Sequence, residues 1–301
     1  MATRIDATAL QARLSENGGV TLVDVLPEEY FAAQHLPGAR RACVYEVDFL
    51  EQINQLGVSP SDELILYGAG DGSLDSAVAA EKLEGAGFTN VIVFNGGRAE
   101  WKNVGGALEG DPMLAPAVVQ PENRPYLIDS DKSTVEWVGR SLTSTHRGLV
   151  SIAKGELTLH NGQLASGHIE LDMRSISNTD IEDASMREVL NAHLKSDDFF
   201  DVEHFPTATL TLHSASPLAG ATPGSPNFDL AADLTIKGIT HPIEFPAIIA
   251  VGSDKTLTAV AQVEIDRTRW NVLYGSGRFF KMLGKHLVND AIDLLVKIVA
   301  R

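Results

Sequence analysis

The spacing of hydrophobic residues changes about 110 residues into the chain, and this change constrains the fold more than any other feature. Before it, the runs 20–25, 63–67 and 90–94 are apolar almost without interruption and rich in β-branched residues. Such runs are typical of parallel strands that are buried on both faces. Residues 75–83 have a helical composition. The first part of the chain therefore predicts an α/β domain built on a parallel sheet.

From residue 126 onward, apolar and polar residues alternate, as they do in antiparallel strands with one buried face. The pair Asn161-Gly162 separates two such runs and indicates a hairpin, because both central turn residues need positive φ. The segment 181–194 breaks the alternation with the spacing of an amphipathic helix. Seven or eight strands and one helix predict an antiparallel barrel or sandwich, of which we prefer the barrel.

A proline-rich stretch separates the two patterns. Residues 111–125 hold four of the 13 prolines in the chain. Because proline fixes φ and has no N–H to donate, such a stretch predicts an extended linker. We therefore expect a first domain at residues 1–110, a linker at 111–125 and a second domain at 126–301.

The charge balance and the cysteine count exclude several kinds of function. The chain has 24 Lys and Arg residues against 40 Asp and Glu residues, a net charge of −16. This argues against binding to nucleic-acid phosphates or to anionic membranes, which basic patches attract. The single cysteine, Cys43, excludes an intramolecular disulfide and a multi-cysteine metal site. The first 30 residues show no secretory signal and no run is apolar enough to span a bilayer, so we expect a cytoplasmic protein without a transmembrane segment.

A glycine-rich loop follows the apolar run at 63–67 and opens onto the helix expected at 75–83. Backbone amides that converge at a helix N-terminus can form an anion site. The glycine spacing is not that of a dinucleotide-binding loop, and the lysine of a phosphate-binding loop is missing. The loop is thus either an anion site or a tight turn in which Ser73 or Asp75 caps the helix. Its residues are Gly68, Ala69, Gly70, Asp71, Gly72 and Ser73.

The residues around this loop resemble those of rhodanese-like sulfurtransferase domains over about residues 5–110. The resemblance rests on Leu22-Val-Asp-Val25, Glu29-Tyr30, His35-Leu-Pro-Gly-Ala39 and Asn95-Gly-Gly97. In that family the catalytic cysteine follows the strand that here ends at Tyr67, and Gly68 stands at its position. The resemblance therefore implies a silent domain without a catalytic residue, which serves as an interaction or regulatory module. Cys43 is either a buried small residue or a reactive thiol that replaces the missing cysteine.

The residues after the linker resemble YceI-like proteins over about residues 126–301. The resemblance rests on Ser196-Asp-Asp-Phe-Phe-Asp-Val202, Leu234-Thr-Ile-Lys-Gly-Ile-Thr240 and Ile265-Asp-Arg267. It implies a lipocalin-like antiparallel barrel that binds a polyisoprenoid or a similar long-chain amphiphile, such as a quinone or a fatty acid. An eight-stranded barrel encloses just enough space for one slender ligand.

Apolarity and expected position nominate ten residues for contact with such a chain, although ordinary core packing would also explain each of them. They are Trp137, Leu149, Ile152, Met186, Leu190, Phe199, Phe200, Phe205, Ile236 and Trp270. His146, Arg147 and Arg267 are candidates for contact with a polar head group, or else form surface ion pairs. We expect no cofactor and no metal, because His193 and His204 lack the spacing of a zinc-binding helix.

These observations favour a carrier or sequestering protein for a hydrophobic small molecule rather than an enzyme. Two other interpretations stay open. One is a protein-interaction module without a lipid ligand, which would bind its partner through the first domain. The other is a sulfurtransferase or persulfide carrier that uses Cys43.

Overall fold

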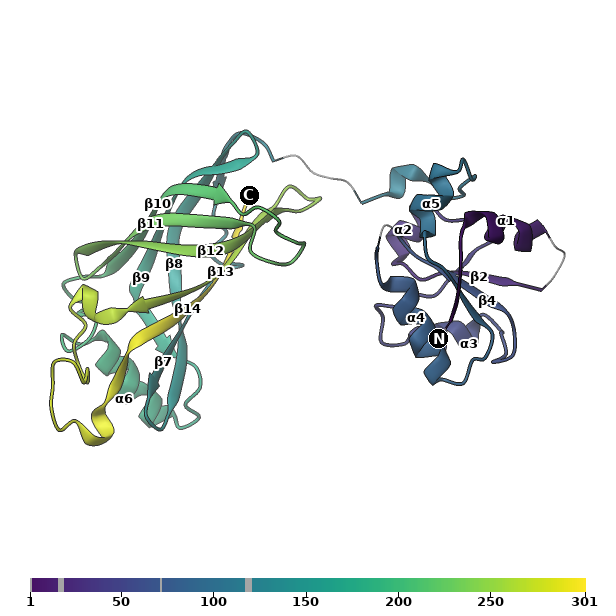
Figure 1. The fold of residues 1–301 in the computed structure, drawn as a ribbon. Coiled ribbons are helices and arrows are strands. Elements are labelled where there is room, and N and C mark those ends of the chain that lie inside the picture. The colour runs from purple at the N-terminus through teal and green to yellow at the C-terminus, as the bar shows by residue number, and fades with distance from the viewer. Residues whose placement is uncertain (1, 16–18, 71, 117–120) are drawn as a thin grey trace. The chain divides into compact units, whose positions relative to one another are not determined.

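The structure is a computed structural model that describes residues 2–15, 19–70, 72–116 and 121–301. The chain divides into two compact units, Met1–Ala117 and Val118–Arg301. Figure 1 colours the first unit from purple to blue and the second from teal to yellow. The two units differ in architecture, as the change in hydrophobic spacing predicts.

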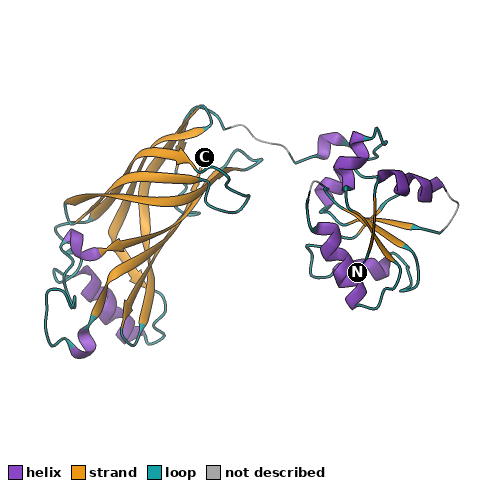
Figure 2. Cartoon of the chain, in the orientation of Figure 1, coloured by secondary structure: helices purple, strands orange, loops and turns teal. Residues whose placement is uncertain are grey.

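In the described part of the first unit, five strands form one parallel sheet in the order β1-β5-β4-β2-β3. Figure 2 shows helices flanking this sheet. This confirms the expected α/β class. The strands are β1 (Thr3–Ile5), β2 (Thr21–Asp24), β3 (Arg40–Arg41), β4 (Leu64–Tyr67) and β5 (Val91–Phe94), and the helices are α1 (Ala7–Ser15), α2 (Glu28–Ala33), α3 (Phe49–Gln55), α4 (Asp75–Gly85) and α5 (Gly97–Asn103).

Strand β4 shows why the runs of the first unit are continuously apolar. Leu64 and Leu66 belong to one hydrophobic cluster, together with residues of α3 and α4. Ile65 and Tyr67 belong to a second cluster with residues of α1 and α5. Because helices cover both faces of the sheet, each of the four positions is buried, and a polar residue at any of them would lose its hydration.

The proline-rich stretch expected as a linker is divided between the two units. The N–H of Asp111 donates to the carbonyl of Ala32 at 2.9 Å, and a short 3₁₀ helix, η1 (Pro112–Leu114), follows. At the other end, β6 (Pro125–Leu127) pairs with a strand of the second unit. Residues 117–120 lie outside the described part of the chain.

In residues 121–301, all of which the structure describes, eight strands form an antiparallel barrel that closes through pairing of β8 with β9. Around the barrel the order is β7-β14-β13-β12-β11-β10-β9-β8, and β6 adds to β8 outside this ring. The expected barrel is thereby confirmed. The strands are β7 (Thr134–Ser141), β8 (Thr145–His160), β9 (Gln163–Asn178), β10 (Thr207–Pro217), β11 (Phe228–Ile236), β12 (Ile239–Val251), β13 (Leu257–Asp266) and β14 (Val288–Ala300).

Helix α6 (Ala184–Lys195) and the long connection from β13 to β14 lie at the same end of the barrel (Figure 1). The helix begins after Asp183, whose carboxylate accepts a hydrogen bond from the N–H of Met186 at 2.9 Å. The connection contains two 3₁₀ helices, η2 (Arg267–Trp270) and η3 (Gly284–His286).

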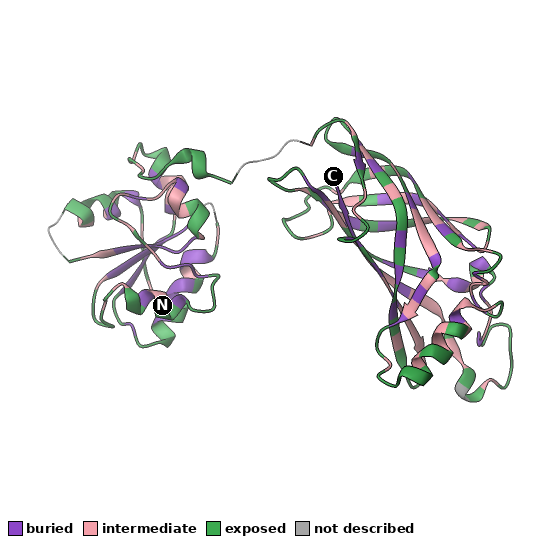
Figure 3. Ribbon diagram, turned by 180° about the vertical axis from the view of Figure 1, so that it is seen from behind, coloured by how far each residue is buried: buried purple, intermediate pink, exposed green. Residues whose placement is uncertain are grey.

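The barrel strands alternate between buried and exposed positions (Figure 3). In β11 the inward residues are Leu230, Ala232, Leu234 and Ile236, each at every second position. The turn between β8 and β9 consists of Asn161-Gly162, with φ of 51° and 76°. The alternation and this hairpin are both as the sequence predicts.

Candidate functional site

The barrel interior is only partly filled, because small residues occupy several inward positions. Ala247 on β12 is 1% exposed and lies between the inward residues Phe245 and Ile249. The other glycines and alanines that line the remaining space are Gly139, Gly167, Ala208, Ala259 and Ala261. Larger side chains at these positions would fill the centre of the barrel, as they do in barrels with solid cores.

The unfilled space consists of two lobes that meet inside the barrel. The mouth lobe, of about 180 Å³, lies at the end that carries α6 and is lined by both aromatic and polar residues. The inner lobe, of about 100 Å³, is lined by aliphatic side chains, Phe245 and one glycine. Val135, Leu171, Leu234 and Leu294 line both lobes. The two lobes are therefore adjacent inside the barrel.

The cavity is long and narrow. Along the regular part of β14, beyond the irregularity after Val288, its lining runs from Ile292 in the mouth lobe to Ile298 in the inner lobe. Six residue steps span about 20 Å along a strand, or about 15 Å along the axis of a barrel whose strands are tilted by about 40°.

Trp137 on β7 lines the mouth lobe with its indole ring. A Cβ at Gly148, its cross-strand neighbour on β8, would lie 2.6 Å from the indole ring and 1.8 Å from the carbonyl oxygen of Ser177. Only glycine at 148 therefore lets the ring lie across β8. The Nε1 of Trp137 is buried without a hydrogen-bond partner among the described residues. Trp270, by contrast, donates its Nε1 to the carbonyl of Leu234 at 3.0 Å.

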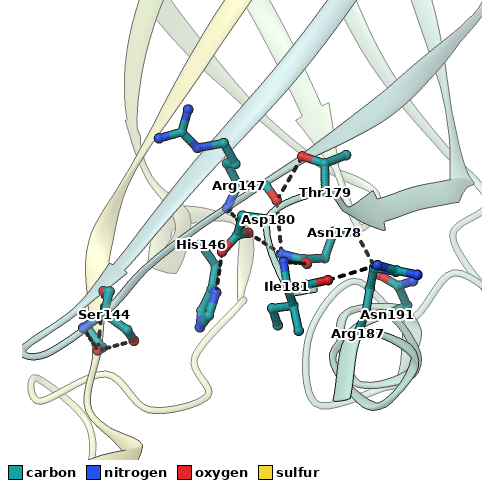
Figure 4. A network of polar contacts seen from close by, with 10 residues as sticks. Ser144, His146, Arg147, Asn178, Thr179, Asp180, Ile181, Arg187 and Asn191 are labelled. Carbon is teal, nitrogen blue, oxygen red and sulfur yellow. Dashed lines mark hydrogen bonds and ion pairs between the residues drawn. The ribbon is translucent and has the colours of Figure 1, made fainter. Parts of the chain in front are cut away.

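Polar side chains stand at the rim of the mouth lobe. The guanidinium of Arg140 forms an ion pair with Asp293. The Nδ1 of His146 lies 3.0 Å from Asp180, which also accepts hydrogen bonds from the N–H of Arg147 and the side chain of Asn178 (Figure 4). Burial raises the pKa of Asp180, but these hydrogen bonds outweigh it and hold the pKa below its ordinary value. The network fixes His146 at the rim.

Arg267 is 1% exposed and lies against the mouth lobe. Its three nitrogens donate to the backbone carbonyls of Asn289, Val272 and Val288 at 3.0, 2.6 and 3.2 Å. Burial lowers the pKa of Arg267, although Asp290, 3.7 Å away, acts in the opposite direction. The guanidinium therefore holds together the connection between β13 and β14.

The glycine-rich loop of the first unit is occupied by a carboxylate of its own chain. A Cβ at Gly68 would lie 2.3 Å from the Cγ of Asp75. The buried carboxylate of Asp75 accepts hydrogen bonds from the N–H groups of Ala69 and Ser76, at 3.0 and 2.7 Å, and from the hydroxyl of Ser73 at 2.8 Å. Three donors of the loop thus already have an acceptor, and the cap expected from Asp75 is replaced by this arrangement. Gly70 and Gly72 have positive φ, and Asp71 lies outside the described residues.

The family model for the YceI-like domain matches residues 126–300, more than half of the chain. The chain belongs to the YceI-like family. A second model, for the rhodanese-like domain, matches residues 6–104, so that both resemblances noted in the sequence are confirmed. The search of curated proteins finds no match.

Solved structures similar to each part are known. BcnA from Burkholderia cenocepacia is 24% identical, covering 58% of this chain and 99% of BcnA, with a TM-score of 0.46. A polyisoprenoid-binding domain from Saccharophagus degradans, implicated in plant cell wall breakdown, is 15% identical over 58% of this chain and 97% of that domain, with a TM-score of 0.44. The rhodanese-like domain of the Alr3790 protein from Anabaena sp. is 30% identical over 41% of this chain and 91% of that domain, with a TM-score of 0.34.

Six of the ten residues nominated for ligand contact line the mouth lobe of the YceI-like domain: Trp137, Leu190, Phe199, Phe200, Ile236 and Trp270. Two others lie outside the barrel interior, since Leu149 is 42% and Met186 58% exposed. Leu149 faces outward because it alternates with the buried Gly148 and Val150, and Met186 because only the second half of α6 reaches the cavity. Ile152 is buried in the hydrophobic core and Phe205 is half-buried, but neither lines either lobe.

Two of the three residues proposed to contact a polar head group line the cavity, and the third does not. His146 and Arg267 line the mouth lobe, whereas Arg147 is exposed and contributes its backbone to the Asp180 network. The residues that line both lobes were not nominated, although the alternation of β7, β9, β11 and β14 places each of them on an inward face. A systematic count of inward positions in the sequence would have found them.

Cys43 is 1% exposed and free in the rhodanese-like domain. Burial raises the pKa of its thiol, which lowers the fraction of reactive thiolate at neutral pH. Across the described residues, no group of three His, Cys, Asp or Glu side chains is placed to hold a metal ion. A search of the same residues finds no helix that is long and apolar enough to cross a membrane.

Proposed function

We propose that the YceI-like domain binds one long-chain amphiphile of the polyisoprenoid, quinone or fatty-acid type inside the barrel. The observation that supports this proposal is the pair of adjacent apolar lobes, which share four lining residues and follow one another along β14. A single chain would place its tail in the inner lobe and its polar end at the rim.

The energetics of such a complex require no reacting group. Burial of each methylene contributes about 0.8 kcal/mol. Roughly ten buried methylenes would therefore contribute about 8 kcal/mol, which is within the range of about 4–15 kcal/mol that association costs. Affinity would grow with chain length until both lobes are filled. The protein would act as a carrier or a sequestering protein rather than as an enzyme.

The unpaired indole N–H of Trp137 indicates one further property of the ligand. A buried donor without a partner costs about 1–3 kcal/mol. An oxygen atom of the ligand that accepts this hydrogen bond would remove the penalty, and polyisoprenols, quinones and fatty acids all carry such an atom at the end of a chain. The mouth lobe would therefore hold the oxygen-bearing end, close to Trp137 and His146.

We further propose that the rhodanese-like domain is inactive as a sulfurtransferase and serves as an interaction or regulatory module. Gly68 has no side chain to carry sulfur, and the carboxylate of Asp75 already accepts hydrogen bonds from the N–H groups of Ala69 and Ser76. The alternative of a persulfide carried on Cys43 is disfavoured, because the thiol is buried and its pKa is raised.

Native mass spectrometry of the freshly purified full chain, followed by extraction into organic solvent, tests the main proposal. We expect one single-chain amphiphile per protein, and displacement of that molecule by a fluorescent long-chain fatty acid. An empty protein that also fails to bind the fluorescent probe would refute the proposal. A thiosulfate–cyanide sulfurtransferase assay on the same sample should show no turnover, and turnover that disappears in Cys43→Ser would establish the alternative.

A further inference from the structure

The connection between β13 and β14 differs in charge from the rest of the chain. Residues 271–289 contain Arg278, Lys281 and Lys285 but no aspartate or glutamate, in a chain whose net charge is −16. The same stretch contains the apolar sequence Phe279-Phe280-Lys281-Met282-Leu283. A segment that combines aromatic, apolar and basic residues is typical of protein surfaces that lie at a membrane interface.

The structure presents these apolar residues to solvent. We call residues 275–288 the tip loop. Its base is closed by a hydrogen bond from the N–H of Val288 to the carbonyl of Gly275 at 2.9 Å. Inside it, the N–H groups of Phe279 and Phe280 donate to the carbonyl of the buried Ser276. The resulting turn leaves Phe279 51%, Phe280 46% and Met282 101% exposed.

The tip loop is anchored to the barrel by ion pairs. The guanidinium of Arg278 lies 3.0 Å from Asp266 and 3.5 Å from Asp290. The charge of Arg278 is therefore neutralised by carboxylates of the protein, whereas Lys281 is exposed and follows the two phenylalanines in the sequence. The loop thus holds an apolar tip and a basic side chain on a fixed base, which lowers the entropy that docking would cost.

The tip loop also borders the opening of the barrel cavity. A surface groove of about 280 Å³ runs between the loop, at Gly277 and Leu287, and the turn after β7, at Leu142. Ser141 and Val288 line both this groove and the mouth lobe. Leu142 is itself 80% exposed. The exposed Leu142 and the base of the tip loop therefore border a groove that adjoins the mouth lobe.

We infer that the tip loop docks onto the surface of an anionic lipid bilayer. Phe279, Phe280 and Met282 would enter the headgroup region, and Lys281 would contact the lipid phosphates. The purpose of this docking, exchange of the ligand between bilayer and cavity, rests on the function proposed above; the docking itself depends only on the loop. A bilayer is the occupant that matches both the charge of the loop and its position at the opening.

The negative charge of the whole chain does not prevent this docking. At physiological salt the Debye length is about 8 Å, so charges farther from the contact are largely screened. The acidic groups in contact with the tip loop, Asp266 and Asp290, are both paired with Arg278. The charges of these two carboxylates are therefore partly offset by Arg278, and the exposed Lys281 adds a positive charge at the tip.

Flotation of the full chain with vesicles tests the inference. We expect binding to vesicles made of equal parts phosphatidylcholine and phosphatidylglycerol, and much weaker binding to phosphatidylcholine alone. Lys281→Glu should weaken the partition coefficient roughly 25-fold, because it removes one attraction and adds one repulsion of similar size. Phe279→Ser combined with Phe280→Ser should weaken it about tenfold or more, because less apolar surface enters the bilayer.

Two matched variants in the rhodanese-like domain serve as controls. Lys102→Glu makes the same change in net charge at an exposed site, and Met113→Ser removes an apolar side chain that is 88% exposed. Neither should change flotation. Equal losses in Lys281→Glu and Lys102→Glu, or no binding of the wild-type chain to the anionic vesicles, would overturn the inference.

Two further measurements separate this inference from the function proposed above and from a protein partner. All variants should still bind a fluorescent fatty acid in the absence of vesicles, because none of the changed residues lines the cavity. Binding of the probe without flotation would overturn docking alone, and flotation without binding of the probe would overturn only the proposed function. Sedimentation of the vesicle-free chain as a dimer that Phe279→Ser dissociates would identify a second copy, not a bilayer, as the occupant.

Discussion

Substitution of Ala247 by phenylalanine tests whether a ligand chain reaches the inner lobe. Ala247 is buried on β12 and lines only the inner lobe, whose volume is about 100 Å³. A phenyl ring placed there would exclude about four methylenes of a bound chain, which corresponds to about 3 kcal/mol of binding free energy. We therefore expect a roughly 150-fold weaker affinity for a long-chain fluorescent fatty acid. A short-chain analogue that occupies only the mouth lobe should bind unchanged.

Ala250→Phe is the matched control, because Ala250 lies on the same strand and is exposed. It adds the same ring to the outside of the barrel and should leave both affinities unchanged. Since the inner lobe has room for the ring, thermal unfolding should show that Ala247→Phe costs less than the 1–3 kcal/mol typical of overpacking a filled core. If Ala247→Phe folds and still binds the long chain with wild-type affinity, the chain does not occupy the inner lobe.

Three more measurements address individual side chains. Trp137→Phe should weaken binding of a ligand with a terminal oxygen about three- to tenfold relative to an oxygen-free analogue, because one hydrogen bond of about 0.5–1.5 kcal/mol is lost. Equal losses of affinity for both ligands in calorimetric titration would contradict this role. Gly68→Cys should lower the unfolding free energy of the rhodanese-like domain by more than about 2 kcal/mol, because the new Cβ would lie 2.3 Å from Asp75. In urea unfolding, Asp75→Ser should relieve most of that cost in the double variant, and an equal cost of Gly68→Cys in both backgrounds would refute the contact. Burial raises the pKa of Asp24 from 3.8 and outweighs the hydrogen bond from Leu26, so the stability that this carboxyl contributes is full below pH 3.8 and is lost as pH rises through its folded-state pKa. Asp24→Asn should flatten this decline in urea unfolding across a pH series, and an unchanged slope would contradict the prediction.

The sequence predicts the fold well because the fold depends on patterns that repeat. Residues 64–67 are apolar without a break since both faces of the sheet are covered, and residues 230–236 alternate since one face of the barrel strand meets water. Asn161-Gly162 predicts its turn because few other pairs adopt positive φ at both positions. Each of these signals is local, so it can be read before the chain is folded.

The site is less predictable because neighbouring apolar residues can face opposite ways. Leu149 and Val150 are equally apolar, but only Val150 points into the barrel, and the phase of the strand decides between them. Met186, Leu190 and Leu194 share a helical spacing, although the first turn of α6 lies beyond the cavity. The place of Asp75 in the glycine-rich loop depends on how that loop folds back, which no periodicity encodes.

The width of the cavity connects the proposed ligand with the inferred bilayer. An eight-stranded barrel encloses one slender chain, so a two-chain phospholipid would not fit into lobes of about 180 and 100 Å³. The bulk lipids of a bilayer would therefore be a docking surface and not a ligand. Selection of a single-chain component would follow from shape, since a second chain has no space, and from the unpaired N–H of Trp137, since a pure hydrocarbon cannot accept its hydrogen bond. Both requirements act inside the barrel, whereas the charge and the exposed phenylalanines of the tip loop act only at its opening.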